Sequence, residues 1–212
     1  MKTTLCALLV ATALLPGAGV QAQTFGQFTG APPLEVNGRM FGTYIQSSEN
    51  VLGLLGQLRL SFYPGVDFGF HGGLARQDYD GDSRTALRLG ADFKYAMLAP
   101  SQAYPYSLSV GGALGVEAGD NYNVLAIGPM LVGSRTLATG ETVTLTPYAA
   151  IGAHFTRVNA GDEDYTDFSM PVFAGAVLRV SPQVDLVAEL QFRLGDAAND
   201  DVGFALGANF PF

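Results

Sequence analysis

Two histidines, His71 and His154, are the side chains of this sequence best suited to act as a general base near neutral pH. His154 is followed at the second position by Thr156, and Glu163 lies a few residues further on. A histidine that activates a hydroxyl nucleophile and is oriented by a carboxylate is the arrangement used for hydrolysis. Here threonine stands where a serine is usual and the carboxylate has an irregular spacing, so we interpret His154 as a structural histidine and predict no catalytic residue.

Acidic residues form a second group that suggests chemistry. Asp78, Asp80 and Asp82 resemble the start of a calcium-binding loop, but Leu89 occupies the twelfth position, where such a loop needs a bidentate glutamate. The cysteine count is one, and Cys6 lies in an N-terminal apolar stretch. We therefore predict no metal site, no cofactor and no disulfide.

A third group consists of charges that recur on one side of alternating segments. They are Arg39, Arg59, Arg88, Asp92, Lys94, Arg179, Asp185, Glu189 and Arg193. Inside a barrel they would form either a selectivity lining for a narrow pore or a paired network that fills the bore. We favour the filled bore, because side chains nearly fill barrels of eight to ten strands.

The elements that carry these charges alternate with a period of two, which predicts β-strands. From 184 to 194, for example, Leu186, Leu190 and Leu194 share one face, whereas Asp185 and Glu189 share the other. Ten strands are predicted, with eight as the alternative. Their ranges are 34–47, 51–63, 66–77, 85–97, 104–117, 122–134, 142–156, 168–180, 184–194 and 202–212.

The N-terminus has the features of a secretory signal peptide. Lys2 precedes a short apolar stretch, Pro16 and Gly17 interrupt it, and Val20-Gln21-Ala22 offers small residues for cleavage. We predict a signal peptide at 1–22, a short linker at 23–33 and one β-barrel domain at 34–212.

Composition favours a barrel in a membrane over a soluble one. Charged residues make up 14% of the chain, against about 25% in soluble proteins. No segment after the signal has the run of about 20 apolar residues that a membrane helix needs. The net charge of −8 argues against nucleic-acid binding. The expected fold class is an all-β, antiparallel, up-and-down transmembrane β-barrel, with a soluble lipocalin-like barrel as the alternative.

The sequence also resembles the small outer-membrane β-barrel proteins, the OmpA/OmpX/OmpW-like "porin family". The resemblance rests on residues 147–153 (PYAAIGA), 173–186 (FAGAVLRVSPQVDL) and 206–212 (LGANFPF). It implies an outer-membrane location, contact with lipids and lipopolysaccharide, and recognition of the terminal Phe212 by the barrel assembly machinery.

Three functions follow as expectations. The first is a non-enzymatic outer-membrane barrel that is structural or forms a narrow passive pore. The second is a lipid A-modifying hydrolase, since His154 and Thr156 faintly resemble the His-x-Ser site of outer-membrane deacylases. The third is a soluble, secreted binding barrel. We prefer the first.

Overall fold

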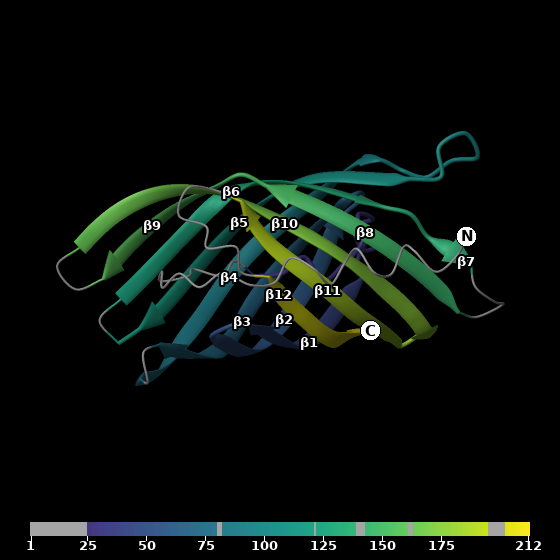
Figure 1. The fold of residues 1–212 in the computed structure, drawn as a ribbon. Helices are drawn as coiled ribbons and strands as arrows, with labels where there is room; N and C mark the ends of the chain where they lie inside the picture. The colour runs from purple at the N-terminus through teal and green to yellow at the C-terminus, as the bar shows by residue number, and fades with distance from the viewer. Residues whose placement is uncertain (1–24, 80–81, 121, 139–142, 161–162, 195–201) are drawn as a thin grey trace, which may run out of the picture.

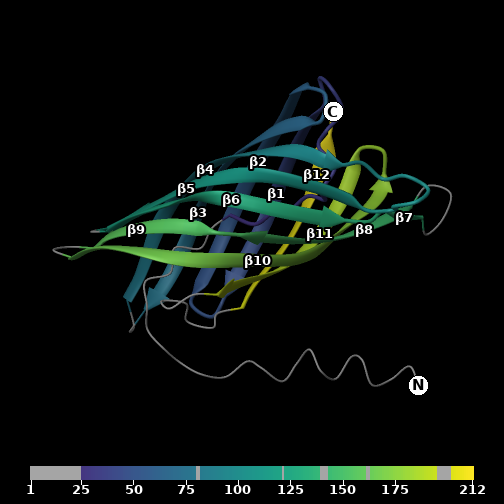
Figure 2. The ribbon, with the colours of Figure 1, turned by 90° about the horizontal axis from the view of Figure 1, so that it is seen from above.

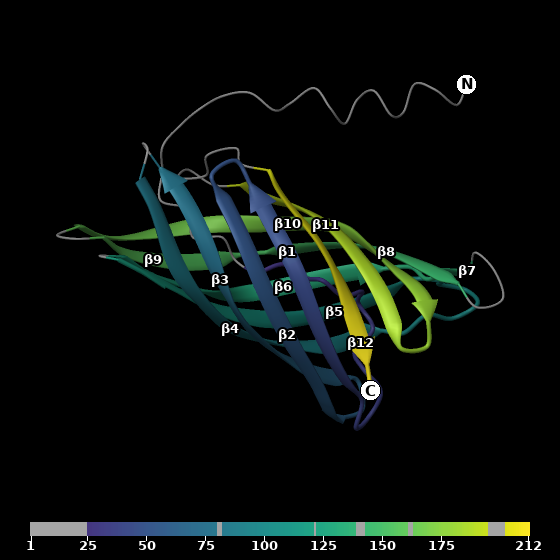
Figure 3. The ribbon, with the colours of Figure 1, turned by 90° about the horizontal axis from the view of Figure 1, so that it is seen from below.

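The chain folds into an antiparallel β-barrel in the computed structural model, which describes residues 25–79, 82–120, 122–138, 143–160, 163–194 and 202–212 (Figure 1). From β1 to β6 and from β9 to β12, each strand pairs with the next one in sequence, and the barrel closes where β1 pairs with β12, the purple and yellow strands in Figure 3. The strands are β1 (Arg39–Ser48), β2 (Val51–Tyr63), β3 (Val66–Tyr79), β4 (Asp82–Leu98), β5 (Ser107–Gly119), β6 (Tyr122–Ser134), β7 (Leu137–Ala138), β8 (Thr144–Gly152), β9 (His154–Ala160), β10 (Glu163–Ser181), β11 (Val184–Leu194) and β12 (Gly203–Pro211).

Ten strands make up the wall, as the sequence predicts. β8 and β9 keep one register against β6, where Met130 lies opposite Gly152 and Ile127 opposite Phe155, so they form one wall strand interrupted at Ala153. β7 is two residues long and pairs only with β8. The interruption has a local cause: Ala153 N–H donates to the carbonyl of Pro129 at 3.1 Å, but Pro129 has no N–H to return the bond.

The first strand begins later than predicted. The sequence places its start at residue 34, whereas β1 begins at Arg39. A turn precedes it, in which Gly38 N–H donates to the carbonyl of Glu35 at 2.8 Å and Asn37 has a φ of 65°. This turn redirects the chain from the barrel interior into the wall.

Apolar side chains cover the outside of the barrel and polar ones face its bore. Leu58, Phe93 and Phe204 are 38%, 48% and 41% exposed, whereas Arg59, next to Leu58 on β2, is 1% exposed. This is the polarity of a barrel surrounded by hydrocarbon, and it is opposite to that of a lipocalin-like barrel, whose apolar face is inside. Figures 2 and 3 show the closed wall from above and below. No helix among the described residues is long and apolar enough to cross a membrane.

Candidate functional site in the barrel lumen

Residues 25–34 lie inside the barrel, and we call them the lumen segment. Phe28 and Ala31 are completely buried, and Gln27 and Thr29 nearly so. The sequence predicts a linker at 23–33; the structure differs for residues 25–33, which are packed against the inner wall. They belong to no strand, and Phe28 has a φ of 54°, a conformation that interrupts an extended chain.

Glu189 on β11 is the main anchor of the lumen segment. Its carboxylate accepts hydrogen bonds from the backbone N–H groups of Gln27 (3.0 Å) and Phe28 (2.9 Å). It also accepts bonds from the Tyr148 hydroxyl (2.6 Å) and the Gln191 side-chain amide (2.7 Å). Glu189 is 1% exposed, so its charge is stabilised by these four donors in place of water.

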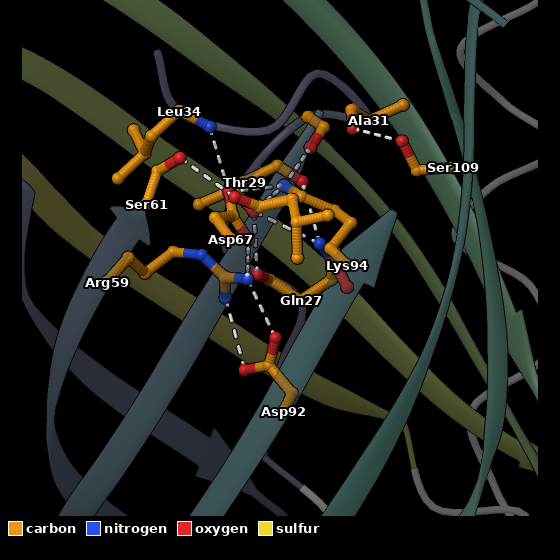
Figure 4. Close-up of polar contacts among 12 residues, drawn as sticks. Gln27, Thr29, Ala31, Leu34, Arg59, Ser61, Asp67, Asp92, Lys94 and Ser109 are labelled. Atoms are coloured by element: carbon orange, nitrogen blue, oxygen red, sulfur yellow. Dashed lines mark hydrogen bonds and ion pairs between the residues drawn. The ribbon is translucent and has the colours of Figure 1, made fainter. Parts of the chain in front are cut away.

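Other wall side chains bind the rest of the segment's backbone. Asn209 donates to the Phe28 carbonyl (3.1 Å), Lys94 to the Gly30 carbonyl (2.8 Å) and Ser109 to the Ala31 carbonyl (2.5 Å), while Ser134 accepts from Ala31 N–H (2.9 Å) and Asp67 from Leu34 N–H (3.0 Å). Figure 4 shows part of this set, with the segment above the side chains of β2, β3 and β4. Wall side chains therefore supply the hydrogen bonds that a neighbouring strand would supply in a sheet.

Two aromatic side chains fix the position of the segment along the bore. The Phe28 ring stacks on Tyr44, with centroids 3.9 Å apart, and the Phe25 ring stacks on His71 at 5.0 Å. Phe25 also lies against Gly90, where an added Cβ would come within 2.4 Å of its ring. A glycine is thus required at that wall position for Phe25 to fit.

A buried cluster of charges lies beside the segment on β2, β3 and β4 (Figure 4). The Arg59 guanidinium pairs with Asp67 at 2.5 Å and with Asp92 at 2.7 Å. Asp92 also contacts His71 at 2.5 Å, and Lys94 lies 3.7 Å from Asp67. Charges removed from water are stable only when each has opposite partners, a condition this cluster meets through contacts on three adjacent strands.

A second polar cluster lies further along the bore. Arg88 pairs with Glu117 at 2.5 Å and donates to the side-chain carbonyl of Gln46 at 3.0 Å. Glu117 also accepts from Gln77 at 2.6 Å and from Tyr122 at 2.8 Å. All of these partners belong to the wall, so this cluster links strands without touching the lumen segment.

The structure brings together most of the charged residues that the sequence places in the bore. Arg59, Asp92 and Lys94 share one cluster, Arg88 lies in the other, and Glu189 binds the segment.

The remaining predicted residues lie elsewhere along β1, β10 and β11. Arg179 and Asp185 pair at 2.8 Å, with Arg179 half-exposed. Arg193 is on the lumen side of β11 and is partly buried.

Arg39 is the one predicted member of this set that faces outward. It is exposed at the start of β1 and shares its side of the strand with Phe41 and Ile45, while the intervening Met40 and Tyr44 are buried. The prediction was wrong because it followed the charge of Arg39 and not the alternation of β1.

Sequence reasoning missed several lumen residues. Asp67, Glu117, Ser134, Tyr148 and Asn209 all lie on the inward parity of their strands, and parity was the signal that would have found them. The lumen segment itself has no comparable signal, since its glycines and prolines suggest a linker.

Among the described residues, two spaces lie beside the lumen segment. A vestibule of about 270 Å³ lies at the end of the barrel where Leu34, Arg179 and Asp185 meet. A small cavity of about 20 Å³ lies between Phe25 and His154, roughly the room for one water molecule. His154 and Thr156 are both buried, so neither faces the lipid side of the wall.

No family model matches the chain, and no curated protein does. Among solved structures it is similar to a de novo designed transmembrane β-barrel (15% identity, 85% of this chain and 99% of that chain covered, TM-score 0.38). It is also similar to the N-terminal β-barrel domain of Pseudomonas aeruginosa OprF (11%, 84% and 98%, TM-score 0.37) and to LpxR from Salmonella typhimurium (9%, 87% and 78%, TM-score 0.47). These likenesses concern the fold.

Proposed function

We propose that the chain is a non-enzymatic outer-membrane barrel of the small OmpA/OmpX/OmpW-like kind, whose lumen is closed by its own N-terminal segment. The observation that carries this proposal is the combination of an apolar exterior with a bore occupied by residues 25–34. The apolar belt meets the requirement of a lipid environment, in which a charged side chain on the outer face is costly at the midplane of the bilayer.

A structural role fits the bore better than an open pore does. A pore lining keeps its charges hydrated and available to passing ions. Here Arg59 is bound to two carboxylates, and Glu189 is bound to four donors, two of which are backbone groups of the segment. Opening a passage through this region requires the segment to leave and these bonds to be replaced by water.

The proposed partners are the lipids and lipopolysaccharide around the belt and, during biogenesis, the barrel assembly machinery. Phe212 is 70% exposed, and its N–H donates to the Arg39 carbonyl at 3.0 Å, which fixes it beside the first strand. An exposed aromatic terminus at the seam between β12 and β1 supports recognition of Phe212 during barrel closure.

Fractionation and conductance together test this proposal. We expect the protein to be recovered with outer membranes, to run as a compact band on gels until it is heated, and to insert into planar bilayers without steady step currents. Steady currents from the unaltered protein would show that the barrel is an open pore and contradict the proposed closure of its lumen. Recovery from the periplasm without detergent would favour the soluble binding barrel.

A further inference from the structure

We infer that the lumen is a peptide-binding site, which residues 25–34 of the chain itself occupy and which also takes a separate peptide of the same pattern. The pattern is an aromatic residue, a glycine, any residue and a second aromatic residue, followed by small residues. The inference rests on the proposed closure of the lumen by this segment, and it goes further by assigning the bore a ligand class.

The wall recognises the segment chiefly through its backbone. Seven backbone groups, from Gln27 N–H to Leu34 N–H, form hydrogen bonds with side chains of the wall. The carbonyls of Gln27 and Thr29 instead accept bonds from each other's side chains. The wall side chains involved are Glu189, Asn209, Lys94, Ser134, Ser109 and Asp67. Backbone recognition gives affinity for an extended chain, whereas side-chain pockets set which sequences fit.

Three positions define those pockets. Phe25 and Phe28, three residues apart, each stack on a wall ring. Between them, Gly26 has no room for a side chain, because an added Cβ would lie 2.1 Å from the Glu189 carboxylate and 2.5 Å from the Gln191 amide. Glu189 cannot move aside without losing its four donors, so the site selects glycine at this position.

The segment can leave without breaking the barrel. Among the described residues, no backbone-to-backbone hydrogen bond joins residues 25–34 to a wall strand, whereas the strands pair continuously with one another. The vestibule of about 270 Å³ adjoins Thr29, Gly30 and Leu34, so one end of the site is already open. Departure of the segment would leave a lined bore with its backbone-binding side chains in place.

The test uses full-length protein carrying Gly26→Asp, which sets a second carboxylate against Glu189 and expels the attached segment while leaving every wall residue unchanged. The matched control is Pro32→Asp, which adds the same charge to the same segment at an exposed position. The probe is a fluorescein-labelled synthetic peptide with the sequence of residues 25–34, and binding is followed by fluorescence anisotropy in detergent micelles.

We expect Gly26→Asp to bind the peptide about tenfold or more tightly than either the unaltered protein or Pro32→Asp, because an attached segment competes at millimolar effective concentration. A peptide with alanine at both phenylalanines should bind about tenfold or more weakly, since truncating buried aromatic anchors removes most of the affinity. Phe28→Ala in the full chain loosens the segment without added charge and gives the same comparison should Gly26→Asp not fold.

Absence of peptide binding to a folded Gly26→Asp protein would overturn the inference. Equal binding by all three proteins would show attachment to the surface or the micelle, with the same consequence. If the alanine peptide binds as tightly as the peptide with both phenylalanines, the two aromatic residues are not part of the recognised pattern. Because anisotropy in micelles depends on neither membrane location nor conductance, a failure here is distinguishable from a failure of the proposed function.

Discussion

Replacing Glu189 by alanine should release the lumen segment while the barrel stays closed as a wall. Glu189 accepts hydrogen bonds from two backbone groups of the segment, Gln27 N–H and Phe28 N–H, and its carboxylate is held in place by two wall donors, Tyr148 and Gln191. Glu189→Ala leaves both N–H groups without an acceptor in a region that is closed to bulk water.

The size of the effect follows from the bonds that are lost. A hydrogen bond to a charged group contributes about 1.5–3 kcal/mol net. Two such bonds join Glu189 to the segment, so the bound form loses about 3 kcal/mol even at the lower value. Since about 1.4 kcal/mol corresponds to a factor of ten, the fraction of molecules with the segment released should rise about a hundredfold.

Thiol labelling measures that fraction directly. Ala31 is fully buried in the segment, and Ala31→Cys in a Cys6→Ser background makes it the sole cysteine. When opening is fast compared with reaction, the rate of maleimide labelling follows the released population. We expect labelling about a hundredfold faster with Glu189→Ala, together with step currents in planar bilayers that the parent protein lacks.

Glu117→Ala is the matched control, because it removes an equally buried carboxylate whose partners are all on the wall. It should lower the stability of the barrel and leave the labelling of residue 31 unchanged. If Glu189→Ala folds and labels at the parent rate, the segment is held by something other than this carboxylate and the reasoning fails.

Leu89→Arg, on the outward face of β4, should destabilise the barrel by about 2–4 kcal/mol, measured by urea unfolding from lipid vesicles. Thr85→Arg, on the same face but nearer the strand end, should cost only about 0–1 kcal/mol. Equal small costs for the two variants would contradict a lipid-facing surface. Arg59→Ala should cost about 3–5 kcal/mol in the same unfolding assay, because it removes the guanidinium that pairs with both Asp67 and Asp92 at the centre of the buried cluster. Arg179→Ala should cost less than Arg59→Ala, because the Arg179 guanidinium is half-exposed and partly hydrated, although its partner Asp185 is buried. A larger cost for Arg179→Ala would show that burial of the arginine does not set the value of these pairs. His154→Ala should leave the acylation of lipid A unchanged, as measured by mass spectrometry. Altered acylation would support the alternative that the protein is a lipid A-modifying hydrolase.

The wall of the barrel was predictable because a membrane forces every strand into the same pattern. Leu186 and Leu190 alternate with Asp185 and Glu189 because one side of β11 meets hydrocarbon and the other meets the bore. The interruption at Ala153 was only partly predictable: Pro129 indicates a weak point on β6, but its effect falls on Ala153, the residue opposite it between β8 and β9. Which residue loses a partner depends on register, and register is a property of the folded sheet.

The lumen segment was not predictable from periodicity, because its own residues carry little of the information that places it. Gly26, Gly30, Pro32 and Pro33 have the composition of a linker. The wall residues that bind the segment are spread along the chain, from Asp67, 33 positions from its partner Leu34, to Asn209, 181 positions from its partner Phe28. A sequence pattern describes the segment that contains it, whereas this site is specified by the segment's partners.

The strand count gives a physical reason why the bore contains a segment of the chain. A barrel of eight strands has an interior just wide enough for its own side chains to fill. Ten strands enclose a wider bore, and glycines at wall positions such as Gly90 and Gly115 widen it further where Phe25 lies. Buried carboxylates such as Glu189 cannot face an empty apolar space, so the additional width must be occupied by water or by protein. In this chain the occupant is a segment in no strand, and inward-facing wall side chains bind both its N–H groups and its carbonyls.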